Sequence, residues 1–116
     1  KDIVAHITWH DREMVGVLKT RKLAGSAWWH LPTEERNQNI FQQYRSQSLE
    51  EALREHHEVH QALLEEIERL EDEALNDPAR IEEMVPGFKL WLILEQNTWI
   101  HYLEHKEAVW AWLERR

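Results

Sequence analysis

The chain has 116 residues, enough for one domain, and we expect residues 1–116 to form a single domain. Acidic residues outnumber basic ones 22 to 14 and the net charge is −8, which argues against a protein that binds the phosphates of nucleic acid. The sequence has no cysteine, which excludes disulfides and thiolate ligands, and no apolar run of about 18 residues, which argues against a membrane partner. We therefore expect a small acidic domain that acts in the cytoplasm.

The pattern of residues predicts an all-α fold. Only three glycines and three prolines are present, and long stretches are rich in strong helix formers. In chain order, helices are predicted over 2–22, about 34–45, 48–70 and 88–115, with a loop at 23–32 and a short helical extension that ends at Pro78. Thr33 is expected to cap the second helix, and Ser48 with Glu51 forms a capping box that opens the third.

Three long helices and one short one predict an up-down four-helix bundle. The inward stripe of the last helix is predicted to contain Leu90, Leu94, Asn97, His101, His105, Ala108 and Trp112. Three long helices bury such stripes poorly, and the sequence starts at Lys1 inside an amphipathic pattern. We therefore expect that the first helix of the bundle is missing from this chain. The alternative is that a partner chain fills the position of the missing helix. The partner that we expect is a second copy of this chain, in a homodimer packed through Trp110 and Trp112.

Histidines give the best lead to function. His101 and His105 are one helical turn apart, so both imidazoles can point at one ion. The chain has eight histidines, however, and His56/His60 and His6/His10 have the same spacing. Glu13, one turn after His10, could be a fourth ligand or a base, although such a residue is more often a solvated charge. Spacing alone leaves three candidate pairs.

The chain has seven tryptophans, which are large apolar side chains, and two of them differ from the rest in their position. Trp28 and Trp29 follow a Gly-Ser-Ala segment, so a loop presents them. They could cover the mouth of a pocket or form a dimer contact. The others, including Trp9, are most simply core or interface residues.

Three segments carry a resemblance to a known family. Lys1-Asp-Ile-Val-Ala-His-Ile-Thr-Trp resembles the "KDxxAH" segment of DinB-like four-helix bundles, in particular the ClbS/DfsB branch. Asn37 to Arg45, followed by Ser48-Leu-Glu-Glu, is similar to the next segment of that branch. Asn97 to His105 is similar to its closing "NTxxHYxxH". The three segments occur in the family's order and cover nearly the whole chain.

The resemblance implies a metal site. In the wider DinB-like superfamily, one histidine of the first segment and two of the last helix bind a divalent ion, often Ni or Zn. Carried over, this pattern implies His6, His101 and His105 as metal ligands, and it leaves His56 and His60 as core or pocket residues. For pocket or supporting roles we expect Trp9, Trp28, Trp29, Asn97 and Tyr102.

The resemblance also bounds the function. It implies a protein that acts on a small-molecule substrate, as a metal-dependent transferase or hydrolase, with detoxification as one role. One alternative is a metal-free ClbS/DfsB-type binding protein or hydrolase. The other is a helical dimerisation module without catalysis.

Overall fold

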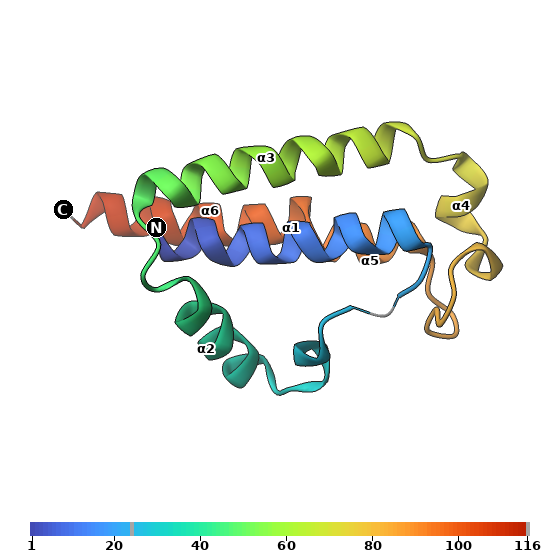
Figure 1. Cartoon of the computed structure of the whole chain (residues 1–116), viewed down its shortest axis with the longest axis horizontal. Helices are drawn as coiled ribbons and strands as arrows, with labels where there is room; N and C mark the ends of the chain where they lie inside the picture. The colour runs from blue at the N-terminus through green and yellow to red at the C-terminus, as the bar shows by residue number, and fades with distance from the viewer. Residues whose placement is uncertain (24, 116) are drawn as a thin grey trace.

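The computed structural model describes residues 1–23 and 25–115, and within them the regular structure is helical apart from one isolated bridge between Lys22 and Glu82 (Figure 1). The α-helices are α1 (Asp2–Thr20), α2 (Thr33–Tyr44), α3 (Leu49–Glu68), α4 (Asp72–Asn76), α5 (Leu90–Asn97) and α6 (Trp99–Glu114). Two 3₁₀ turns complete the elements, η1 (Ala27–His30) and η2 (Pro78–Arg80). The predicted all-α bundle is confirmed.

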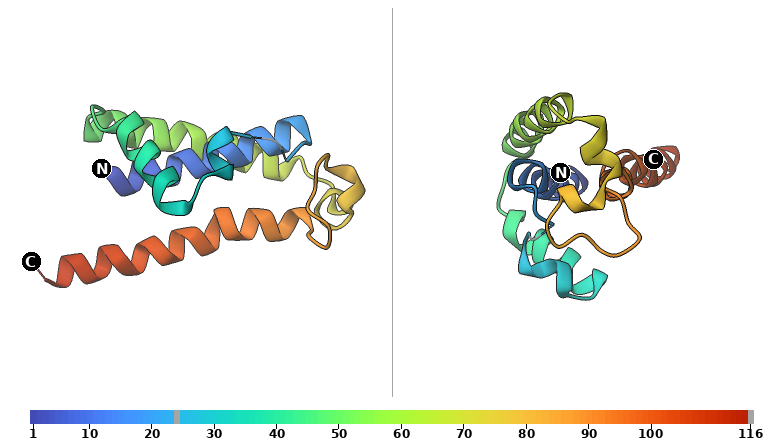
Figure 2. Two further views of the ribbon diagram at one scale, coloured as in Figure 1. Left: turned by 90° about the horizontal axis from the view of Figure 1, so that it is seen from below. Right: turned by 90° about the vertical axis from the view of Figure 1, so that its right-hand side faces the viewer.

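Helix α1 lies at the centre of the bundle. It packs along α3 and also contacts α2, α5 and α6. Figure 1 shows that α1 and α3 run in the same direction, whereas α5 and α6 return in the opposite one. Viewed along the bundle, α3, α2 and the C-terminal helices surround α1 on three sides (Figure 2). This arrangement lets different faces of α1 build different sites.

The main hydrophobic core occupies the end of the bundle where α1 finishes. Its buried side chains come from α1, α3, α5 and the segment before α5, and they are Met14, Val17, Leu18, Leu63, Ile81, Leu90 and Leu94. Burial of apolar surface of this kind is the main stabilising contribution to such a fold. The other half of α1 carries polar side chains at buried positions, and the candidate site is there.

Helix starts and ends agree in part with the sequence prediction. The capping box is present, because the Ser48 hydroxyl accepts a hydrogen bond from Glu51 N (3.1 Å) and the Glu51 carboxylate accepts one from Ser48 N (3.2 Å). Thr33 is not the cap of α2: Pro32 takes that place with an extended backbone, and its carbonyl accepts the first helical bond from Arg36 N. Helix α1 ends at Thr20, two residues early, because Arg21 adopts the left-handed conformation (φ 56°).

The predicted continuous helix over 88–115 is wrong. It begins at Leu90 and is interrupted at Thr98, whose φ of −122° and ψ of −98° lie outside the helical region. The Thr98 hydroxyl donates to Leu94 O (2.6 Å) and the Asn97 amide donates to Ile93 O (2.9 Å). Side chains that bond to the preceding turn in this way bend or interrupt helices. The break separates α5, which enters the core, from α6.

The outer half of α6 does not follow the predicted inward stripe. Ala108 and Trp112 are exposed, and no described residue of α6 is fully buried. Figure 2 shows the C-terminal end of α6 diverging from the rest of the bundle, beyond the packing with α1. In the part of the chain that the structure describes, no helix is long and apolar enough to cross a membrane.

Candidate metal centre

Four histidines meet where α1 and α6 face each other. His6 and His10 lie one turn apart on α1, and His101 and His105 lie one turn apart on α6. The Nε2 atom of His101 lies 3.0 Å from Nε2 of His6 and 3.0 Å from Nε2 of His105. The structure thus brings together the three residues that the resemblance implied.

His10, to which the resemblance assigned no role, joins this cluster. Its Nδ1 donates a hydrogen bond to the His6 carbonyl (3.0 Å), and its ring centroid lies 4.4 Å from that of His101. Ligand atoms of His6, His10 and His101 all lie within 4.8 Å of one another. Because Nδ1 carries the proton, Nε2 of His10 keeps its lone pair. The spacing of four from His6 was the signal in the sequence that could have found it.

The surroundings lower the pKa of three of these imidazoles and so favour their neutral form. Burial lowers the pKa of His6 to about 3, with further contributions from His10, His101, His105 and Arg36. Burial also lowers the pKa of His10 to about 4, although its bond to the His6 carbonyl acts in the opposite direction. The pKa of His101 is lowered by burial and then by His105. Neutral imidazole is the form that binds a metal.

The donor set fits a divalent transition metal. A neutral imidazole carries one N–H, so Nε2 of His101 can satisfy only one of its two Nε2 neighbours, while its Nδ1 is buried without a partner. Nitrogen ligands about 2.0–2.1 Å from a tetrahedral Zn²⁺ lie roughly 3.3 Å from one another. The separations of 3.0 Å are close to that value. The cluster therefore has the chemistry of a three-histidine site, and two of its nitrogen separations are close to the required spacing.

The third histidine pair, His56 and His60 of α3, packs against another face of α1. The Thr8 hydroxyl is 3.2 Å from His56 Nδ1, and His60 Nδ1 is 3.7 Å from Asp11 Oδ2. The two rings stack on each other with centroids 5.6 Å apart. Neither ring belongs to the four-histidine cluster. The structure thus separates the candidate pairs that spacing alone could not.

Asp11 and Tyr102 join α1 to α6 beside the cluster. Asp11 is completely buried, and its Oδ1 accepts a hydrogen bond of 2.6 Å from the Tyr102 hydroxyl. Burial raises the pKa of the Asp11 carboxyl. The pKa of the Tyr102 hydroxyl is raised by burial and by the bond to Asp11. Tyr102, expected in a pocket or supporting role, lies against Asp11 and fixes the part of α6 that carries His101.

Two cavities adjoin the cluster, and another lies next to the larger of the two. One of about 460 Å³ opens directly over it and is lined by His6, His10, Trp29, Thr33, Arg36, Asn37, Gln96, Asn97, His101, Glu104 and His105. A second of about 460 Å³ is more apolar and shares Trp29 and Asn97 with the first. A third, of about 170 Å³, reaches His6 and His105 from the side of Phe41. A small molecule therefore has access to the histidines.

The loop that carries the two tryptophans is held against α1 by Glu13. One carboxylate oxygen of Glu13 accepts hydrogen bonds from Ser26 N (2.7 Å) and from the Trp29 indole (2.8 Å). A Cβ at Gly25 would lie 3.1 Å from that oxygen, which is tighter than an ordinary van der Waals contact, so glycine suits this close approach. Glu13 thus anchors the loop and places Trp29 in the cavity wall.

The remaining predicted pocket residues take different places. Asn97 lines both large cavities. Trp9 is buried behind Trp29, with ring centroids 5.0 Å apart, and stacks on Trp28 at 6.0 Å. Trp9 and Trp28 do not line the three cavities. Trp9, on α1, instead packs against both tryptophans of the loop.

Comparison with known proteins agrees with this arrangement. The family model of the DinB superfamily matches residues 1–105, which include all four clustered histidines. No curated protein and no solved structure matches the chain. Because the match covers nearly the whole sequence, the chain belongs to the DinB superfamily.

Proposed function

We propose that the protein binds a divalent metal ion, Ni or Zn, at His6, His101 and His105, and acts on a small molecule in the cavity above them. The observation that carries this proposal is the contact of His101 Nε2 with Nε2 of His6 and with Nε2 of His105, each at 3.0 Å. His10 adds a ligand atom that lies within 4.8 Å of those of His6 and His101. Three imidazoles with an open fourth position are typical of catalytic metal sites. His10 lies within reach of the same ion.

The residues around the site support this role. The bond from His10 Nδ1 to the His6 carbonyl fixes the orientation of one ring, and the Tyr102–Asp11 bond fixes the helix that carries His101. Contacts of this kind orient metal ligands in other proteins. A bound ion would supply Lewis-acid chemistry, stabilising negative charge on a substrate oxygen or sulfur atom. We propose a transferase or hydrolase of the ClbS/DfsB type, with detoxification as one role.

Metal analysis of the protein, purified without a histidine tag, tests the proposal. We expect near-stoichiometric Ni or Zn in the wild type and a loss of bound metal in His101→Ala, because His101 is the one residue in contact with both other Nε2 atoms. His10→Ala should retain metal with weaker affinity. His57→Ala, a change at an exposed position of α3, serves as the matched control.

Metal content unchanged by His101→Ala would contradict the assignment. A wild-type protein that takes up no metal, yet binds small molecules with the same affinity after dialysis against a chelator, would favour the metal-free alternative.

A further inference from the structure

One basic side chain of the cavity has no acidic partner. Arg36 of α2 places its guanidinium 5.0 Å from the ring centroid of Trp29, a cation–π contact that leaves its charge uncompensated. Its Nε is buried and has no hydrogen-bond partner. Among the residues that the structure describes, no carboxylate lies within ion-pair distance of it. Arg36 lines the same cavity as the four histidines.

Four other arginines in the chain have an acidic partner. In a protein of net charge −8, acidic partners are abundant. Ion pairs with glutamate are made by Arg12, Arg21, Arg69 and Arg80. An arginine that lines a cavity with free donors is suited to an anion that enters from solvent, because its N–H groups match the two oxygens of a carboxylate.

We propose that Arg36 binds a carboxylate group of the small-molecule substrate while the reacting group of that molecule lies at the histidines. This inference rests on the proposed function, and it names the class of substrate. The cavity joins Arg36 to the cluster directly, since both line it. The neighbouring apolar cavity, which shares Trp29 and Asn97, offers space for a nonpolar part of the same molecule.

The charges of the cavity favour a carboxylate over a phosphate. Arg36 is the only lysine or arginine among its lining residues, and Glu104 lies on the α6 side. A single negative charge is balanced by one guanidinium. Apart from a bound metal ion, no other positive charge lines the cavity to meet the second charge of a phosphate near −2, and Glu104 would repel it.

The position of Arg36 depends on a chain of contacts from α1. The Glu13 carboxylate accepts a hydrogen bond from the Trp29 indole, and the Arg36 guanidinium packs over the Trp29 ring. Arg36 is therefore placed in the cavity by contacts that do not involve the histidines. Its substitution should leave metal binding intact.

A matched pair of probes tests the proposal in the metal-loaded protein. 3-Mercaptopropionate and its uncharged amide share a thiol that can reach the metal and differ in the carboxylate. We expect the acid to bind about tenfold more tightly than the amide, the size of one charge-assisted hydrogen-bonding contact. Arg36→Gln should remove this preference, and Arg36→Lys should keep part of it. Metal content should not change in either variant.

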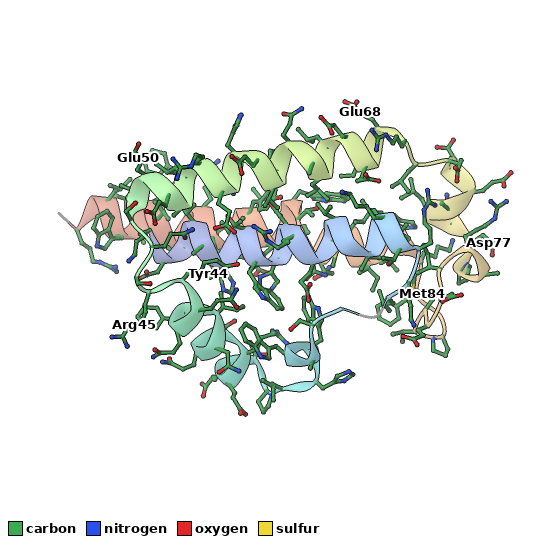
Figure 3. All side chains as sticks on the ribbon, in the orientation of Figure 1. Tyr44, Arg45, Glu50, Glu68, Asp77 and Met84 are labelled. Atoms are coloured by element: carbon green, nitrogen blue, oxygen red, sulfur yellow. The ribbon has the colours of Figure 1, made fainter. Side chains whose placement is uncertain are left out.

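Two further variants make the test specific. Glu104→Gln removes the opposing charge and should strengthen binding of the acid. Arg45→Gln, at the exposed end of α2 (Figure 3) and outside the cavity, should leave both affinities unchanged.

Two results would overturn the proposal: equal affinities of the wild type for the two probes, or an undiminished preference in Arg36→Gln. If the protein binds no metal, the proposed function fails separately. The carboxylate site is then tested by titrating acetate and acetamide, with the Trp29 indole N–H followed by NMR. A shift with acetate alone that Arg36→Gln abolishes supports the site, and equal responses overturn it.

Discussion

Burial makes neutral histidine the stable form at this site. The pKa of His6 falls to about 3 and that of His10 to about 4, because their rings lie among other rings between α1 and α6. A buried imidazole that resists protonation keeps its lone pair available over a wide pH range. The same property makes the protein without metal sensitive to acid.

The stability of the metal-free protein should fall between pH 6.5 and about 4, in part because of His10. In the unfolded chain His10 takes up a proton near its ordinary pKa of 6.5, whereas in the folded protein it does so only near 4. The unfolded state therefore binds more protons in this window, and the free energy of unfolding decreases as the pH falls, by at most about 1.4 kcal/mol per pH unit for one histidine. Urea titrations in the presence of a chelator measure this dependence.

His10→Asn should make that dependence shallower, and His57→Ala should not. The comparison with variants is needed because Asp11, whose pKa is raised by burial, acts in the opposite direction. An equal slope in the wild type and His10→Asn would contradict the prediction.

At the scale of the elements, α1 has two polar faces with separate tasks. One face carries His6 and His10 toward α6, and the other carries Thr8 and Asp11 toward α3. The Tyr102 hydroxyl reaches Asp11 between these faces and holds α6 in register with α1. The ring of Tyr102 also lies 6.2 Å from that of His60 on α3, so three helices meet at this point.

Tyr102→Phe should lower the free energy of unfolding by roughly 1–3 kcal/mol, the cost of leaving a buried acceptor without its donor. Asp11 is fully buried, so no solvent replaces the lost hydroxyl. Chemical denaturation of the two proteins at neutral pH measures the difference. Metal affinity should weaken as well, because the neighbouring residue His101 loses its support.

Asp11→Asn is the variant to compare with Tyr102→Phe. The amide oxygen still accepts from Tyr102, and the buried charge is removed, so the cost should be smaller than that of Tyr102→Phe. A Tyr102→Phe protein as stable as the wild type would show that the bond does not hold α6 to α1.

At the scale of the whole molecule, the histidine cluster connects the two ends of the chain. His6 and His101 are 95 residues apart in sequence, and α6 contributes no fully buried side chain of its own. A ligand that bridges α1 and α6 should therefore stabilise the whole bundle. Trp99, Leu103 and Trp110 on α6 are about half exposed, and the homodimer expected from the sequence stays a prediction.

Addition of Zn²⁺ or Ni²⁺ should raise the melting temperature. An ion present at about 100 times its dissociation constant stabilises the folded state by about 2.7 kcal/mol, or on the order of 10 °C for a domain of this size. Differential scanning calorimetry with and without metal measures the shift. His101→Ala should abolish it, and His57→Ala should retain it. A shift of the same size in His101→Ala would place the ion elsewhere.

The sequence by itself determined the helices and much of the candidate site. Periodicity and capping signals are local, so the all-α fold and the capping box at Ser48 could be predicted from them. The ordered resemblance implied His6, His101 and His105, and the structure places these three rings together. The break at Thr98 was missed, because it depends on side-chain bonds to the preceding turn that compete with a continuous helix.

Only the tertiary structure decided which polar residues share one site. Helical spacing treats His6/His10, His56/His60 and His101/His105 alike, since each pair lies on one face of its own helix. The packing of α6 and α3 against different faces of α1 joined the first and last pairs and left His56 and His60 with Thr8 and Asp11. The same packing brought Arg36 into the cavity, a contact between segments distant in sequence that no local pattern encodes.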